Sequence, residues 1–181
     1  MVDAARQPLI EVKAYTEVEK VEGFVGNFKV TLREKAKYVR ADRCNGCGAC
    51  AKVCPIEVPN YFEMNLAPRK AAYIPMSQSV PLVYNIDMDT CIHCYKCVEA
   101  CGPLEAIDFS MKDEFVDEEI GAIIVATGFG HFDPSPMEEY GYNRYPNVIT
   151  SMEMERLNNS AGPTAGSLIR PSDGKKPQNL A

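Results

Sequence analysis

The sequence predicts an α+β protein in which a cysteine-rich domain is flanked by β-rich segments. Two groups of four cysteines share one spacing, and each group reads as a loop followed by a short helix. Alternating apolar residues on either side of these groups are typical of paired strands. Apolar residues make up 46% of the 181 residues and charged residues 24%, so the chain is able to bury a core.

Residues 1–36 are expected to form paired strands. Apolar residues alternate in Ile10–Ala14, in Val18–Glu22 and in Phe28–Leu32, and Gly23 and Gly26 are turn signals. The residues before them lack the apolar core of a secretory signal. Disulfides are therefore not expected among the thiols in a reducing cytosol, and a metal site is the better interpretation.

The eight cysteines form two C-x-x-C-x-x-C-x-x-x-C runs, which is the spacing that holds [4Fe–4S] clusters in bacterial two-cluster ferredoxins. Three thiolates on a tight loop each reach one corner of a cubane, while the fourth, one helical turn further on, points towards the other cluster. The runs are Cys44, Cys47, Cys50, Cys54 and Cys91, Cys94, Cys97, Cys101. Structural zinc is the alternative, but zinc ribbons usually show two separated C-x-x-C pairs.

The two runs are also an internal repeat, because each cysteine of the first is followed 47 residues later by one of the second. The region from residue 37 to residue 110 resembles the pseudo-twofold ferredoxin fold. That resemblance implies that Cys44, Cys47, Cys50 and Cys101 hold cluster 1, and that Cys91, Cys94, Cys97 and Cys54 hold cluster 2. The helix exit of the second run is expected to differ, since Gly102 separates its last cysteine from Pro103.

The two clusters are not expected to be equivalent. The first loop has the small residues Asn45-Gly46 and Gly48-Ala49, whereas the second has the bulkier Ile92-His93 and Tyr95-Lys96. Because hydrogen bonds and solvent exposure set cluster potentials, we expect the two potentials to differ. His93 is interpreted as a residue that covers the cluster, since four thiolates already complete its ligand set.

The segment between the runs, Pro55–Thr90, is longer than in compact ferredoxins and holds five of the 13 prolines. It is either an extended excursion that wraps the domain or a surface loop. Residues 86–119 carry 10 acidic and two basic side chains, a net charge of −8. This is either a surface that steers a basic partner or a solvated face.

Residues 111–181 are expected to begin with a strand over Glu114–Glu118 and a fully buried strand over Gly121–Gly128 that ends in a glycine turn. Thr150 or Ser151 is then expected to cap a short helix that runs through Leu157. The remainder, Ser160–Ala181, is rich in Gly, Pro and polar residues and is expected to be loop.

A hairpin followed by a strand ending in Ala126-Thr127-Gly128 resembles the flavin-binding half of the two-dinucleotide disulfide oxidoreductases. With a ferredoxin-like insert between them, the order is similar to the A subunit of heterodisulfide reductase and its relatives. The resemblance implies a bacterial-type two-[4Fe–4S] ferredoxin domain inserted in part of a thioredoxin-reductase-like, FAD-binding domain. It also implies that Thr127 and Gly128 lie beside FAD; otherwise they only form the turn that ends a strand.

That family implies electron transfer within a cytoplasmic, anaerobic, flavin-based oxidoreductase that reduces a heterodisulfide, with bifurcation to ferredoxin. Implied partners are other subunits of that complex, ferredoxin, and hydrogenase or formate dehydrogenase subunits. The sequence contains no G-x-G-x-x-G fingerprint. We therefore expect an internal piece of a larger flavoprotein, which binds FAD only together with the remainder.

Two other functions remain as alternatives, an autonomous soluble two-[4Fe–4S] ferredoxin and a zinc-stabilised binding module. A net charge of −6 argues against binding to nucleic acid, and no apolar stretch is long enough to span a membrane. No nucleophile–base pair, phosphate loop or carboxylate dyad stands out, so no catalytic centre is expected in this chain itself.

Overall fold

The computed structural model describes residues 2–180 and confirms a mixed α and β structure. Contacts between Cα atoms divide the chain into two compact units. The first unit holds the residues up to Ile56, together with Lys70–Ile74 and Gln78–Ala126. The second holds Glu57–Arg69, Pro75–Ser77 and the residues from Thr127 onward. Neither unit is continuous in sequence, because part of the segment between the cysteine runs belongs to the same unit as the C-terminal residues.

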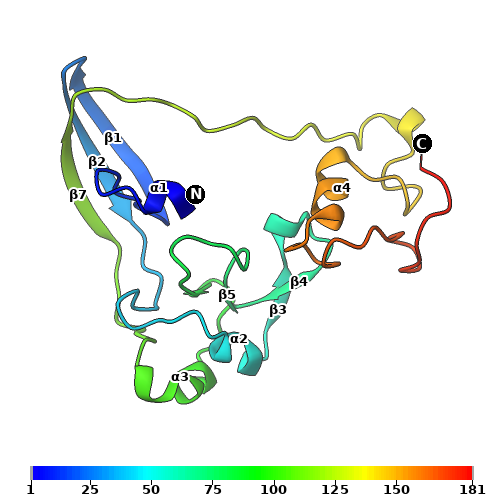
Figure 1. Ribbon diagram of the computed structural model, residues 1–181, viewed down its shortest axis with the longest axis horizontal. Coiled ribbons are helices and arrows are strands. Elements are labelled where there is room, and N and C mark those ends of the chain that lie inside the picture. Colours follow the sequence, from blue (N-terminus) through cyan, green and yellow to red (C-terminus); the bar gives the residue numbers. More distant parts are fainter. Residues whose placement is uncertain (1, 181) are drawn as a thin grey trace. The chain divides into compact units, whose positions relative to one another are not determined.

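The flanks of the cysteine region form a three-stranded antiparallel sheet in the order β1-β2-β7 (Figure 1). Strands β1 (Thr16–Phe24) and β2 (Asn27–Glu34) are a hairpin with a two-residue turn, and β7 (Glu114–Ile120) pairs along β2. The register places Glu34 opposite Glu114. The whole cysteine region therefore leaves the sheet at the end of β2 and returns to it at the start of β7.

The expected strand at Ile10–Ala14 is wrong. A short helix, α1 (Val2–Ala5), precedes this stretch, and residues 10–14 have no regular structure. Ile10 is 49% exposed and Val12 41% exposed, so their apolar alternation does not face a core. A segment with alternating apolar residues forms a strand only where it can pair with a neighbouring strand and pack against a core. Residues 10–14 pair with no strand in the described sheets.

Asp113 ties the end of β2 to the start of β7. One of its carboxylate oxygens accepts the Ala36 N–H at 2.9 Å, and the other accepts Arg33 Nε at 2.7 Å. These two hydrogen bonds hold the pKa of Asp113 below its ordinary value, and the bond from Ala36 has the larger effect. The strand expected at Glu114–Glu118 is confirmed directly after this anchor.

Between β2 and β7 the chain forms a small core with two short helices, α2 (Ala49–Val53) and α3 (Lys96–Cys101), which contact each other. The two-residue strands β5 (Ala72–Tyr73) and β6 (Asn85–Ile86) and a bridge between Val39 and Ile107 complete it. Cys50 and Cys97 belong to the buried core cluster, and four further cysteines pack against it. Much of the interior of this unit is therefore made of thiols.

The segment between the cysteine runs is more than a surface loop, because its end returns to this core with Val83 and Ile86 buried. Its earlier part forms β3 (Glu57–Pro59), the 3₁₀ turn η1 (Tyr61–Glu63) and β4 (Pro68–Lys70), and β3 pairs with β4. A second 3₁₀ turn, η2 (Gly102–Leu104), follows α3.

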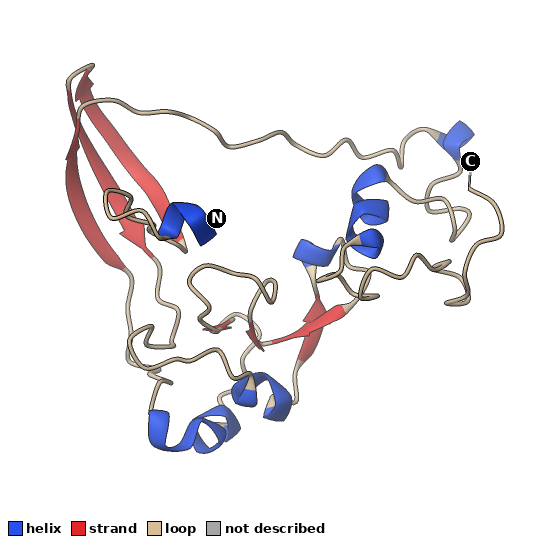
Figure 2. Ribbon diagram, in the orientation of Figure 1, coloured by secondary structure: helices blue, strands red, loops and turns tan. Residues whose placement is uncertain are grey.

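The second unit is organised around α4 (Ser151–Asn158), which the expected Thr150 cap begins. Thr150 and Glu153 form a complete capping box. Arg156 on the same helix makes a buried bidentate ion pair with Glu63 of η1, at 3.0 and 3.1 Å. A 3₁₀ turn, η3 (Glu138–Tyr140), lies upstream, and the residues after α4 form the expected loop (Figure 2).

The expected buried strand at Gly121–Gly128 is also wrong. These residues have no regular structure and belong to the long loop after β7 (Figure 2). Ile124 is 92% exposed and Val125 77% exposed. An apolar run becomes a buried strand only where other strands lie on both sides of it. Within residues 2–180 no strand pairs with residues 121–128.

Candidate metal centre

The two cysteine runs line two separate pockets of the first unit, and each pocket takes cysteines from both runs. One pocket is lined by Cys44, Cys47 and Cys50 of the first run and by Cys101 of the second. The other is lined by Cys91, Cys94 and Cys97 together with Cys54. No lining residue of either pocket carries a charged side chain. Each set of four thiols thus faces a mainly apolar space.

Exposure of the thiols follows their position in the run and repeats from one run to the other. The third cysteine of each run, Cys50 or Cys97, is buried, whereas the second, Cys47 or Cys94, is exposed. Burial raises the pKa of Cys50 to about 12 and also raises that of Cys97. A bound metal must therefore displace the proton from these thiols. All eight cysteines are free of disulfides.

The two loops have the same backbone with different residues. In the first loop Gly46 and Gly48 are left-handed, with φ of 72° and 77°. The residues at the matching positions of the second loop, His93 and Tyr95, are left-handed too, with φ of 53° and 58°. Glycine adopts this region without cost, while other residues lose about 1 kcal/mol each. The fold therefore dictates the loop shape in both runs.

Backbone hydrogen bonds repeat in the same way. The Cys44 N–H donates to Arg40 O at 3.0 Å, and the Cys91 N–H donates to Asp87 O at 2.9 Å. The helix exits differ, as expected from Gly102. Cys54 is extended after α2, whereas Cys101 is the last residue of α3 and Gly102 follows it with a φ of 53°. The Ala106 N–H then donates to Cys101 Sγ at 3.3 Å.

The first loop is covered by the segment that returns before β6. A Cβ at position 46 would lie 2.7 Å from Leu82 Cγ, and one at position 48 would lie 2.9 Å from Tyr84 Oη. Both distances are shorter than real Cβ contacts, so a larger residue at either position would displace Leu82 or Tyr84. Burial raises the pKa of Tyr84, and the neighbouring thiols raise it further by a smaller amount. The Tyr84 hydroxyl therefore stays protonated and remains a donor.

The second loop carries its own cover. The rings of His93, Tyr95 and Phe109 lie together, with centroids 5.3 Å apart for Tyr95 and Phe109 and 5.8 Å apart for His93 and Phe109. Tyr95 also lines the pocket of Cys54, Cys91, Cys94 and Cys97. We call His93, Tyr95 and Phe109 the aromatic trio. Phe109 and Tyr84 were not predicted as parts of the site, since only their position after folding brings them to it.

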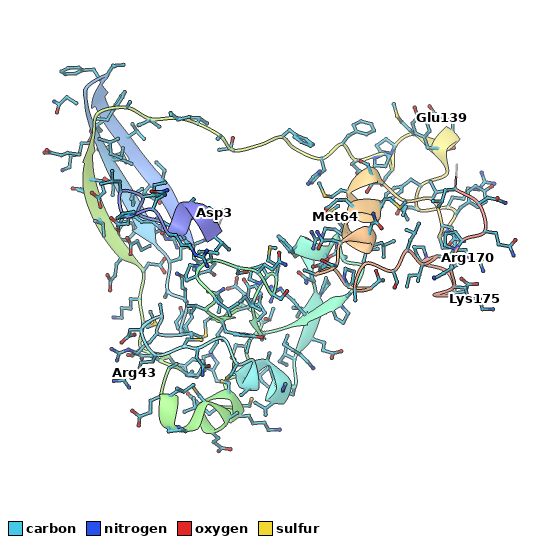
Figure 3. The ribbon with its side chains drawn as sticks, in the orientation of Figure 1. Asp3, Arg43, Met64, Glu139, Arg170 and Lys175 are labelled. Atoms are coloured by element: carbon cyan, nitrogen blue, oxygen red, sulfur yellow. The ribbon has the colours of Figure 1, made fainter. Side chains whose placement is uncertain are left out.

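Four free thiols bound each of the two pockets. Within residues 2–180 no group of three or more His, Cys, Asp or Glu side chains is placed to hold one metal ion. A cubane needs thiolates at its separate corners, and each pocket is bounded by three thiols of one run and the fourth thiol of the other. Charged groups stay at the margin: Arg43, labelled in Figure 3, pairs with Glu105 at 3.2 Å and lines neither pocket.

Comparison with protein families supports the same class of site. Residues 43–103 match the 4Fe-4S dicluster domain. The chain therefore carries an iron–sulfur dicluster domain, and its eight cysteines account for two [4Fe–4S] clusters.

The rest of the chain is similar to known proteins as well. It is 54% identical over 180 residues to the iron-sulfur A subunit of the CoB–CoM heterodisulfide reductase of Methanocaldococcus jannaschii, covering 99% of this chain and 27% of that protein. It is 48% identical over its full length to the A subunit of the H₂:CoB–CoM heterodisulfide,ferredoxin reductase of Methanothermobacter thermautotrophicus, of which it covers 27%. The predicted resemblance is confirmed: the chain is similar along its length to about a quarter of the A subunit of heterodisulfide reductase.

A third relative, the A subunit of the ferredoxin:CoB–CoM heterodisulfide reductase of Methanosarcina mazei, is 43% identical over 182 residues, with 100% of this chain and 23% of that protein covered.

Thr127 and Gly128 lie in the exposed loop after β7. The second unit has a cavity of about 750 Å³ whose wall includes Met64 (labelled in Figure 3) and residues 129–134, but not Thr127 or Gly128. No helix in the described part of the chain is long and apolar enough to cross a membrane.

Proposed function

We propose that this chain conducts electrons through its two clusters within an oxidoreductase of the heterodisulfide reductase type. The observation that carries the proposal is the pair of mainly apolar pockets, each bounded by four free thiols. A [4Fe–4S] cluster accepts and releases single electrons. The similarity extends through both flanks of the dicluster domain to proteins named for CoB–CoM heterodisulfide reduction. That extent favours a part of such a complex over an autonomous ferredoxin.

We assign Cys44, Cys47, Cys50 and Cys101 to cluster 1, and Cys91, Cys94, Cys97 and Cys54 to cluster 2. The composition of the two pocket walls supports this assignment. Contact between α2 and α3 supports it too, because Cys54 follows α2, Cys101 ends α3, and each lines the pocket of the other run. The assignment accounts for every cysteine of the chain.

The protein around the pockets prepares them for electron transfer. Apolar walls such as Val39, Ile86 and Ile107 exclude water. Less solvent then has to reorient when a cluster gains or loses an electron, so the reorganisation energy is lower. The Ala106 N–H donates to the sulfur of Cys101, and such hydrogen bonds stabilise the added electron. The chain thereby sets potential and water access, while no bond of a substrate is broken within it.

Metal content tests the proposal directly. The protein purified anaerobically should contain about eight iron atoms and eight acid-labile sulfides per chain. It should also give the EPR signal of reduced cubane clusters after treatment with dithionite. A colourless preparation that contains zinc and lacks sulfide would refute the iron–sulfur proposal. A full complement of clusters in a chain that never associates with a complex would favour the autonomous ferredoxin.

Paired cysteine substitutions test the ligand assignment. If the pockets hold the clusters as assigned, Cys47→Ala with Cys101→Ala removes two ligands from cluster 1 and leaves cluster 2 intact. Cys47→Ala with Cys54→Ala removes one ligand from each cluster. The first variant should retain about four iron atoms with an unperturbed cubane signal. The second should show two perturbed clusters. The opposite pattern would mean that each run holds its own cluster.

We further propose that the flanks belong to a FAD-binding domain of the thioredoxin reductase type, with Thr127 and Gly128 beside the flavin. The resemblance of Ala126-Thr127-Gly128 to the turn beside FAD in the two-dinucleotide disulfide oxidoreductases supports this placement. Thr127→Val in the complete flavoprotein should change the flavin absorption spectrum or its occupancy. Unchanged flavin content and spectrum would refute the placement.

The proposed partners are the other subunits of a heterodisulfide-reductase-type complex, with ferredoxin, hydrogenase or formate dehydrogenase subunits as electron donors or acceptors. Names of relatives support this proposal, one of them the A subunit of an H₂/formate:CoB–CoM heterodisulfide,ferredoxin reductase from Methanococcus maripaludis. Anaerobic affinity purification followed by mass spectrometry should recover these subunits in fixed ratio. Recovery of the chain alone would contradict the proposal.

A further inference from the structure

Tyr84 brings a phenol hydroxyl to the pocket of cluster 1. Its side chain is part of the wall that four thiols complete, those of Cys44, Cys47, Cys50 and Cys101. After burial, the thiols of the first run are the groups that raise its pKa, so its hydroxyl lies within electrostatic reach of all three. Within residues 2–180 this hydroxyl makes no hydrogen bond. Its proton is therefore free to be donated to a group in the pocket.

Gly48 leaves room for this hydroxyl beside the first loop. A Cβ at position 48 would come 2.9 Å from Tyr84 Oη. The left-handed backbone there, with φ of 77°, does not by itself require glycine, because Tyr95 adopts the same region at the matching position of the second run. The close approach of the Tyr84 hydroxyl is what distinguishes position 48 from position 95.

Backbone donors to the thiols repeat between the two runs, whereas the side-chain donor does not. The sulfur of Cys50 accepts a hydrogen bond from the Ala51 backbone. The sulfur of Cys97 accepts one from the backbone of Val98, 47 residues after Ala51. The residue that precedes the phenol by the same interval is Lys37, which lines neither pocket. Cluster 1 therefore has a donor without a counterpart at cluster 2.

Besides the thiols, two other polar side chains line the pockets, and both are exposed to solvent. Asn45 is exposed, and its side-chain carbonyl accepts the Cys47 N–H at 3.1 Å. Tyr95, a member of the aromatic trio, lines the pocket of cluster 2 but is 53% exposed. Water therefore competes for the donors of both side chains, whereas Tyr84 is partly buried.

We propose that the Tyr84 hydroxyl donates a hydrogen bond to a sulfur of cluster 1 and thereby raises the reduction potential of that cluster. The inference rests on the proposed function, because it assumes two clusters with the assigned ligands. Reduction adds negative charge to the cluster, and a donor to one of its sulfurs stabilises that charge. Because the hydroxyl faces one pocket alone, Tyr84 adjusts cluster 1 without adjusting cluster 2.

Tyr84→Phe is the direct test, because it removes the hydroxyl and keeps the ring in the wall. The measurement is an EPR-monitored redox titration of the anaerobically purified complex. The cluster 1 midpoint is identified as the one that the variant with Cys47→Ala and Cys101→Ala loses. In Tyr84→Phe this midpoint should fall, so that the ratio of reduced to oxidised cluster 1 at a fixed applied potential decreases roughly threefold or more. A threefold change corresponds to about 28 mV for a one-electron couple.

A matched control and a second readout separate the hydrogen bond from a change in packing. Tyr95→Phe removes the same group beside the other pocket and should leave the cluster 1 midpoint in place. After exchange into D₂O, pulsed ENDOR of reduced cluster 1 should show an exchangeable deuteron that Tyr84→Phe lacks and Tyr95→Phe keeps.

An unchanged cluster 1 midpoint in Tyr84→Phe, an equal fall in Tyr95→Phe, or a deuteron signal that survives in Tyr84→Phe would overturn the inference. Loss of cluster 1 from Tyr84→Phe would overturn it too, since the hydroxyl would then hold the cluster in place rather than adjust its potential. Iron and sulfide are determined on the same samples. If the unmodified chain holds two clusters, these results count against Tyr84 alone. If it does not, the proposed function itself fails.

Discussion

The buried ion pair between Arg156 and Glu63 gives a prediction whose magnitude follows from its geometry. Both side chains are less than a tenth exposed, and the guanidinium makes two hydrogen bonds to the carboxylate. It also lies 4.7 Å from the centre of the Phe62 ring. Breaking a buried pair by removing one partner costs about 3–5 kcal/mol, because the other charge remains desolvated. Glu155, 3.6 Å from Arg156 Nη1, offers a weaker exposed partner, so we expect a cost of about 3 kcal/mol for Glu63→Gln.

Hydrogen exchange measured by mass spectrometry tests this locally. A loss of about 3 kcal/mol should speed exchange in the α4 peptides roughly 100-fold. A double variant with Glu63→Leu and Arg156→Met should recover most of the protection, since an apolar pair leaves no buried charge. Exchange of β1, β2 and β7, which lie in the other unit, serves as the internal control. Protection in α4 that is unchanged by Glu63→Gln would refute the reasoning.

Three further predictions concern the cap, the sheet and the clusters. Thr150→Ala removes the side-chain half of the capping box and should cost about 1 kcal/mol, measured as faster exchange at the start of α4; no change there would contradict the role of the cap. The pKa of Asp113 is lowered in the folded chain, so its stabilising effect is present above the unfolded pKa and is lost as pH falls through the folded value. Protection at the β2–β7 end of the sheet should therefore decrease below about pH 4, and Asp113→Asn should abolish that pH dependence. Removal of both clusters with a chelator and an oxidant should expose the amides of residues 38–54 and 86–109, where thiols form much of the core, and spare the three-stranded sheet. Equal loss of protection in the sheet would show that the clusters stabilise the whole unit.

Local signals predicted the parts of the fold that depend only on nearby residues. The hairpin of β1 and β2, the strand after Asp113 and the Thr150 cap are each determined by neighbours within a few positions. Cysteine spacing likewise identified a dicluster domain, because a cubane demands thiolates at short fixed intervals. The altered helix exit was also predicted from nearby residues, because Gly102 separates Cys101 from Pro103.

Features that depend on distant chain were missed or misjudged. Residues 121–128 have the composition of a buried strand, but burial requires neighbouring strands that the described residues do not supply. Leu82, Tyr84 and Phe109 join the site through the return of segments far from the loops that they cover. The pair of Glu63 and Arg156 joins residues 93 positions apart, and no local pattern marks it.

Glu34 and Glu114 stand opposite each other where the cysteine region leaves and rejoins the sheet. The two ends of the region emerge side by side from neighbouring antiparallel strands, so the region is inserted at one end of a strand pair. A short turn between β2 and β7 would restore an ordinary three-stranded meander in the order β1-β2-β7. The length of the region between these strands is therefore not constrained by the register of β2 and β7.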